Sequence, residues 1–100
     1  MHFQLYFTDE ARNQLDVLRE TPAKAALLKQ VEKTLGLMQV NMRHPSLRTH
    51  PYTSLVNPID RNEKVFEAYV QQNTPGAYRI FWTYGPGKGN ITIIAITPHP

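Results

Sequence analysis

The chain has 100 residues, of which 41% are hydrophobic and 19% charged, and it carries a net charge of +3 with no cysteine. This composition excludes a disordered chain, disulfides and cysteine-ligated zinc, and the length suits a single domain over residues 1–100. The first residues, MHFQLYF, lack the features of a signal peptide and no segment is long enough to span a membrane. A cytoplasmic protein with no membrane partner is therefore expected.

The first two predicted elements are a strand and a helix. Phe3, Leu5 and Phe7 alternate with polar residues, which predicts a half-buried strand. Thr8 and Asp9 then offer a helix N-cap, and a helix is expected from about Asp9 to Glu20 with its apolar side facing inward.

A second helix is predicted directly after the first. Thr21 and Pro22 are a capping residue and a proline suited to a first helical turn, and the helix should run from Ala23 to about Gln39. Its apolar residues recur every three or four positions, a pattern typical of core rather than of a cofactor site. The short connection predicts an antiparallel helical hairpin.

Three strands are predicted in the last third of the chain, after a proline-broken segment at 41–62 that has room for short extended pieces. The strands are Val65–Gln71, Tyr78–Tyr84 and Ile91–Thr97, and short turns join them, so they should pair antiparallel. The first strand should lie at an edge or across the sheet. We expect a two-layer α+β domain, with the helical hairpin on one face of a mainly antiparallel four-stranded sheet.

The basic charge is concentrated in the second part of the sequence. Residues 1–40 hold equal numbers of basic and acidic side chains, whereas residues 41–100 hold six basic and three acidic ones. Such an excess suggests a polyanionic partner, although on charge alone a mildly basic surface without such a partner is the favoured interpretation. His44 and His50 lack metal-ligand spacing, so neither a metal nor another cofactor is expected.

Two residues near the C-terminus do not fit a purely structural hairpin. Arg79 alternates with Ile80 and Trp82, so it should project from the sheet face that the helices leave open, near Glu67 or Tyr69. A cross-strand ion pair with Glu67 and no further role is the alternative. His99, held between two prolines, could exchange a proton near neutral pH, or it could be a solvated residue at a chain end.

The order of these elements, with three segments of sequence, resembles the RelE/ParE superfamily of toxins from bacterial type II toxin–antitoxin systems. The segments are VFEAY at 65–69, YRIFW at 78–82 and IIAITPH at 93–99. The resemblance extends over nearly the whole chain. It implies the two-layer fold expected above and a cognate antitoxin, usually an acidic and partly disordered protein.

In the RelE branch, the resemblance implies a ribosome-dependent endoribonuclease that cleaves mRNA and arrests translation. The ribose 2′-OH attacks the adjacent phosphate, which requires a cation and proton-transfer groups. Arg79 and His99 fall at positions that imply catalytic roles. The residues expected to bind RNA are cations, a histidine and aromatics around them: Arg43, Arg48, His50, Arg61, Lys64, Tyr69 and Tyr84. One of the two tyrosines, Tyr69 or Tyr84, would stack a base on the open face.

Two other functions fit the same resemblance. The ParE branch inhibits DNA gyrase and is not a nuclease, and a histidine near the end of the chain does not distinguish it from the RelE branch. A member that binds an antitoxin but has little activity is the third possibility.

Overall fold

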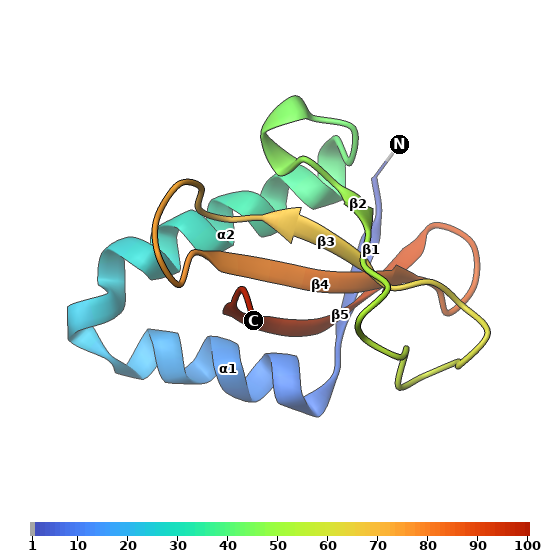
Figure 1. Cartoon of the computed structure of the whole chain (residues 1–100), viewed down its shortest axis with the longest axis horizontal. Helices are drawn as coiled ribbons and strands as arrows, with labels where there is room; N and C mark the ends of the chain where they lie inside the picture. Colours follow the sequence, from blue (N-terminus) through green and yellow to red (C-terminus); the bar gives the residue numbers. More distant parts are fainter. Residues whose placement is uncertain (1) are drawn as a thin grey trace.

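The computed structural model describes residues 2–100; Met1, the first residue of the segment inspected for a signal peptide, lies outside them (Figure 1). The strands are β1 (Gln4–Phe7), β2 (His50–Pro51), β3 (Phe66–Tyr69), β4 (Tyr78–Tyr84) and β5 (Asn90–Pro98). The helices are α1 (Asp9–Glu20) and α2 (Ala25–Val40), with short 3₁₀ turns η1 (Pro22–Lys24) and η2 (Pro45–Leu47). Within residues 2–100, no helix is both long and apolar enough to cross a membrane.

The sheet has five strands in the order β1-β5-β4-β3-β2, and only the β1–β5 pair is parallel. The predicted α+β fold with a mainly antiparallel sheet is confirmed, and β1 lies at an edge. The sheet exceeds the expected four strands because His50 and Pro51 pair with Glu67 and Phe66 at the opposite edge. His50 and Pro51 are a short extended piece of the kind expected in the proline-broken segment at 41–62.

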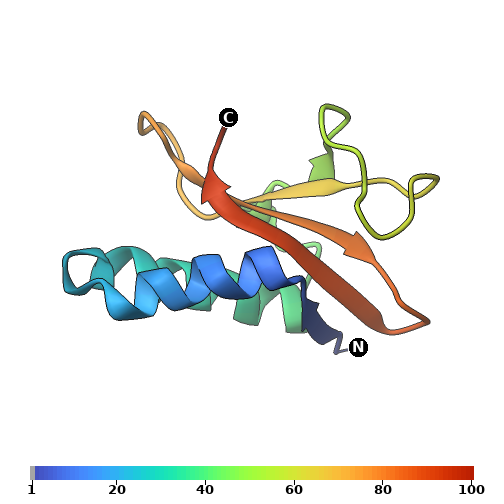
Figure 2. The ribbon, with the colours of Figure 1, turned by 90° about the horizontal axis from the view of Figure 1, so that it is seen from below.

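Both helices cover the same face of the sheet, so the molecule has two layers (Figure 2). Helix α1 has the predicted bounds and cap, since the Thr8 hydroxyl accepts a hydrogen bond of 3.1 Å from the Ala11 amide. The expected cap at Thr21 is wrong. Its hydroxyl donates back to the Val17 carbonyl, and the Thr21 carbonyl closes the 3₁₀ turn with the Lys24 amide before α2 begins.

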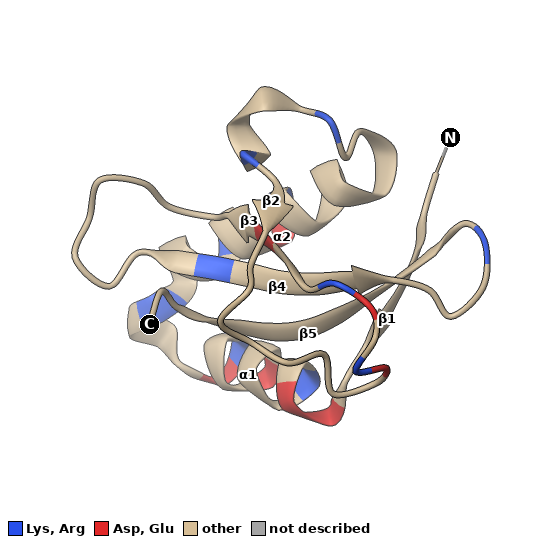
Figure 3. Ribbon diagram, turned by 45° about the vertical axis from the view of Figure 1, so that its right-hand side comes forward, with Lys and Arg blue, Asp and Glu red and all other residues tan. Residues whose placement is uncertain are grey.

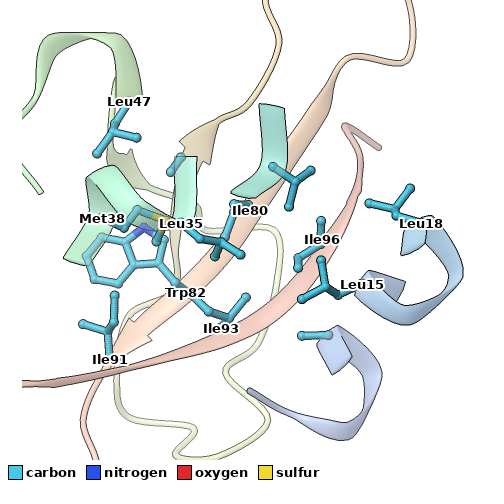
Figure 4. Close-up of a cluster of buried hydrophobic side chains, with 13 residues drawn as sticks. Leu15, Leu18, Leu35, Met38, Leu47, Ile80, Trp82, Ile91, Ile93 and Ile96 are labelled. Atoms are coloured by element: carbon cyan, nitrogen blue, oxygen red, sulfur yellow. The ribbon is translucent and has the colours of Figure 1, made fainter. Parts of the chain in front are cut away.

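The main core lies between the helices and the sheet, around the fully buried Trp82 (Figure 4). A bulge in β5 shapes it: Phe81 pairs with Ala95 and Trp82 with Ile93, so Ile94 is an extra residue. Because of this bulge, Ile93 and Ile96 both face the helices, although strict alternation would separate them. The open face carries a smaller cluster, consisting of Val65, Phe81, Ile94 and Ala95 with Tyr52 packed against it.

Candidate functional site

A buried carboxylate, that of Glu67, lies at the centre of a polar cluster on the open face of the sheet. The residue is only 2% exposed, in the middle of β3, where it pairs with Phe81 of β4 and His50 of β2. A buried carboxylate is costly unless hydrogen bonds and positive charges surround it. Three residues supply them here: His50, Arg79 and His99.

His99 makes the shortest of these contacts. Its Nδ1 lies 2.6 Å from Oε2 of Glu67, and its backbone amide donates to the Ala77 carbonyl, which fixes the residue just beyond β5. The Tyr52 ring meets the imidazole edge-on, with 6.1 Å between the ring centroids. Because Nδ1–H donates to the carboxylate, a neutral His99 has its lone pair on Nε2. The side chain is 44% exposed, so this cluster combines an oriented imidazole with access from outside.

His50 bonds to the other oxygen of the same carboxylate. Its Nε2 lies 2.9 Å from Oε1 of Glu67, while its Nδ1 lies 2.7 Å from the carbonyl oxygen of Arg48. Both partners are acceptors, so the ring donates to both of them only when it is protonated. Arg48 turns its carbonyl toward the ring from a left-handed backbone conformation, with φ of 47°. His50 therefore ties the irregular segment to the carboxylate.

Arg79 is 8% exposed and lies flat against an aromatic ring. Its guanidinium carbon is 3.7 Å from the centroid of Tyr69, and its Nη1 donates to the backbone carbonyls of Gln71 and Tyr78. Its Nε is 3.8 Å from Oε2 of Glu67 and makes no hydrogen bond. The expected proximity of Arg79 to both Glu67 and Tyr69 is confirmed. Stacking and carbonyl contacts, more than the ion pair, fix the guanidinium.

The cluster contains two arginines, Arg79 and Arg48, and one carboxylate, that of Glu67. The Arg48 guanidinium lies over the same Tyr69 ring, 5.7 Å from its centroid. Figure 3 shows basic positions on β4 and on the loops near β2, and it shows acidic and basic positions together on α1. Within residues 2–100, no three His, Asp or Glu side chains are arranged to hold a metal ion. The arrangement suits proton transfer beside a bound anion.

No family model matches this sequence, and neither does any curated protein. Solved structures do match it over nearly its whole length. A YoeB/ParE toxin from Agrobacterium tumefaciens superposes with a TM-score of 0.69 at 8% identity, covering 98% of this chain and 100% of that one. The E. coli DinJ–YafQ toxin–antitoxin complex superposes with a TM-score of 0.67 at 8% identity, covering 99% of this chain and 94% of that one. The archaeal RelE–RelB complex from Pyrococcus horikoshii superposes with a TM-score of 0.63 at 12% identity, covering 98% of this chain and 96% of that one.

The chain has the RelE/ParE-like toxin fold. These superpositions confirm, at the level of the fold, the resemblance drawn from the three sequence segments. Both helices lie on one face of the sheet (Figure 2). Glu67 pairs with Phe81, whose side chain belongs to the apolar cluster on the other face, so the polar cluster around Glu67 lies on that open face. Five of the residues singled out from the sequence meet there: Arg48, His50, Tyr69, Arg79 and His99.

Four other expected site residues lie elsewhere in the RelE/ParE-like fold. Arg61 and Lys64 lie on the loop before β3, where they line a hollow of about 350 Å³ next to Tyr52. Arg43 and Tyr84 line another hollow, near the end of α2. The expectation that Tyr84 lies on the open face is wrong: its ring packs edge-on against Phe66 and Trp82, on the helix side. Alternation along β4 dictates that side, because Tyr84 lies two residues after Trp82.

Glu67 is the member of the cluster that sequence reasoning treated only as an ion-pair partner of Arg79. A signal was present, since Glu67 is the only acidic residue in any of the five strands of the described chain. Tyr52, beside His99, carried no signal, because it lies in the irregular segment.

Proposed function

We propose that this protein is the toxin of a type II toxin–antitoxin system and that it cleaves mRNA on the ribosome. The observation that carries the proposal is the hydrogen bond between Glu67 and Nδ1 of His99, which directs the Nε2 lone pair of a partly exposed imidazole away from the carboxylate. A carboxylate that orients an imidazole in this way is a recurrent device for making histidine a base.

The cluster supplies the groups that cleavage by a ribose 2′-OH needs. His99 takes the 2′ proton through Nε2, and the 2′ oxygen forms a bond to phosphorus as the bond to the 5′ oxygen breaks. The products are a 2′,3′-cyclic phosphate and a 5′ hydroxyl, whose oxygen takes up a proton from the His99 imidazolium or from water. Arg79 and Arg48, both against Tyr69, offset the charge that develops on the phosphate.

The proposal includes two kinds of partner. The mRNA and the ribosome are polyanions, which suits the basic excess in residues 41–100. Solved structures with this fold include toxins in complex with RelB, DinJ and YefM. By analogy, a cognate antitoxin that is acidic and partly disordered is the expected protein partner.

The decisive experiment adds the purified protein to ribosomes programmed with a defined mRNA and maps the new RNA ends. We expect cleavage by the wild type and losses of about 10²-fold or more for His99→Ala and for Arg79→Ala. Lys88→Ala is the matched control, since it removes an exposed cation from the tip of the β4–β5 hairpin. Circular dichroism confirms that each variant is folded.

A gyrase supercoiling assay with the same preparations tests the alternative. Inhibited supercoiling without RNA cleavage would show that the protein acts as a ParE-like toxin and that the nuclease assignment is wrong. Binding to an antitoxin with neither activity would identify an inactive member.

A further inference from the structure

A second basic hollow lies between the end of α2 and the end of β4, apart from the Glu67 carboxylate. Its volume is about 390 Å³, and it is formed by residues 42–45, 48 and 49 together with Tyr84. Arg43 and Arg48 are both exposed there, His44 lies beside them, and no acidic side chain lines the hollow. The local charge is therefore positive without a neutralising partner, which favours an anionic ligand.

Tyr84 gives this hollow a flat aromatic wall. The residue is 52% exposed although its ring packs edge-on against Trp82 and Phe66, with centroid separations of 4.9 and 5.5 Å, and lies 6.2 Å from Phe3. These contacts hold the ring in place while leaving part of it accessible. An exposed but rigid aromatic ring beside cations is the arrangement that binds a nucleobase together with its phosphate.

His44 also lines this hollow. Its Nδ1 accepts from the backbone amide of Ser46 at 3.2 Å and lies 2.7 Å from the Ser46 hydroxyl. Since a backbone amide can only donate, Nδ1 carries the lone pair and the proton lies on Nε2. The imidazole N–H thus adds to the N–H donors of the two arginines.

Arg48 connects the hollow to the catalytic cluster. It lines the hollow, its guanidinium lies 5.7 Å from the centroid of Tyr69, and its carbonyl binds His50, which contacts Glu67. Arg48 therefore belongs to both the hollow and the cluster around Glu67. A single RNA strand that crosses Arg48 can reach both of them.

We propose that this hollow is a subsite for one nucleotide of single-stranded RNA, next to the phosphate that is cleaved. The base stacks on Tyr84, and its phosphate binds Arg43 and Arg48, with His44 as an additional donor. This inference rests on the proposed nuclease function and adds to it a path for the substrate around the β2 edge of the sheet.

The test measures binding of the free protein to a fluorescein-labelled RNA hexamer with 2′-O-methyl groups, which cannot be cleaved through the 2′ oxygen. Anisotropy titrations at several salt concentrations compare the wild type with Arg43→Ala and Tyr84→Leu. Arg19→Ala is the matched control, because it removes an exposed arginine from α1. Leucine at 84 keeps apolar contact with Trp82 but cannot stack, and thermal unfolding reports whether that variant is folded.

We expect Tyr84→Leu to weaken binding about fivefold or more, the lower end of measured base stacking. Arg43→Ala should weaken binding and reduce the slope of log affinity against log salt by about 0.7, the value for one phosphate of a single strand. Arg19→Ala should bind like the wild type. Amide NMR shifts on adding the hexamer should include those of residues 43, 44 and 84.

Other outcomes overturn the subsite. Equal losses for Arg43→Ala and Arg19→Ala would indicate unspecific attraction. Loss for Arg43→Ala with none for Tyr84→Leu would indicate a patch for an acidic protein segment instead. The ribosome assay separates the two proposals: cleavage combined with unchanged hexamer binding in both variants removes the subsite alone. Binding that depends on Arg43 and Tyr84 without any cleavage supports the subsite and removes the nuclease.

Discussion

Nδ1 of His99 lies 2.6 Å from Oε2 of Glu67, although Glu67 is in β3 and His99 directly follows β5, and β4 lies between these two strands. Contact is possible because the chain beyond β5 continues beside the start of β4, where the His99 amide donates to the Ala77 carbonyl. The side chain of Glu67 reaches the same place from the open face. The pair therefore depends on the pairing of all three strands.

Replacement of the carboxylate should abolish activity without unfolding the protein. Glu67→Gln has nearly the same shape, but its amide nitrogen must face one of the two imidazoles as a donor, which disrupts the contact with either His99 or His50. We expect RNA cleavage on ribosomes to fall about 10²- to 10⁴-fold, as for the loss of an oriented base. Initial cleavage rates measure the activity, and a thermal melt shows whether the variant is folded.

Glu63→Gln is the control for this change, since Glu63 is an exposed acid on the loop before β3. It should cleave at the wild-type rate. Wild-type activity of Glu67→Gln would contradict the assignment of His99 as a base held by the carboxylate.

Most of the fold follows from periodicity in the sequence. Alternation along β4 places Arg79 on the open face, and the apolar spacing in α1 gives its buried side, while the cap at Thr8 marks its start. Two details had no such signal. A strand of two residues, His50–Pro51, is too short to show a period, and the bulge at Ile94 adds a residue that no alternation reveals.

The candidate site was only partly predictable for a related reason. Antiparallel pairing of the last two strands, which the sequence predicts, brings the start of β4 beside the end of β5, and this pairing brings Arg79 and His99 toward each other. Arg79 Nε and His99 Nδ1 lie 3.8 and 2.6 Å from the same atom, Oε2 of Glu67. The positions of His50 and Tyr52 depend on the path of a long irregular segment, for which local sequence contains no rule.

Tyr52 should position His99 without taking part in the chemistry. Its ring lies between Phe81, at 4.9 Å, and His99, at 6.1 Å between centroids. We expect Tyr52→Ala to reduce kcat about tenfold with little change in KM, because a loosened imidazole spends less time in the reactive orientation. Tyr52→Phe should restore the rate. If Tyr52→Phe is as impaired as Tyr52→Ala, the hydroxyl has a chemical role and the positioning account is wrong.

The hydrogen bonds predict opposite tautomers for two of the histidines. Neutral His99 should carry its proton on Nδ1, which faces Glu67, whereas neutral His44 should carry it on Nε2, since its Nδ1 accepts from Ser46. Long-range ¹H–¹⁵N correlation spectra distinguish the two forms by their nitrogen shifts. Finding the same tautomer for both rings in their neutral forms would contradict one of these contacts, and Ser46→Ala and Glu67→Gln would show which.

A single methyl-for-hydroxyl exchange should stabilise the protein. The Oγ1 atom of Thr49 is buried without a hydrogen-bond partner, so the folded state bears its desolvation cost. Thr49→Val removes that atom at nearly constant shape, and we expect the free energy of unfolding to rise by about 1 kcal/mol, or Tm by about 4–8 °C. Thr34→Val is the matched control, because the buried Thr34 hydroxyl donates to the Gln30 carbonyl at 2.8 Å. Urea titrations of both variants measure the free energy of unfolding, which Thr34→Val should leave unchanged or lower. An equal gain in both variants would show that the effect comes from the apolar methyl group and not from the unpaired hydroxyl of Thr49.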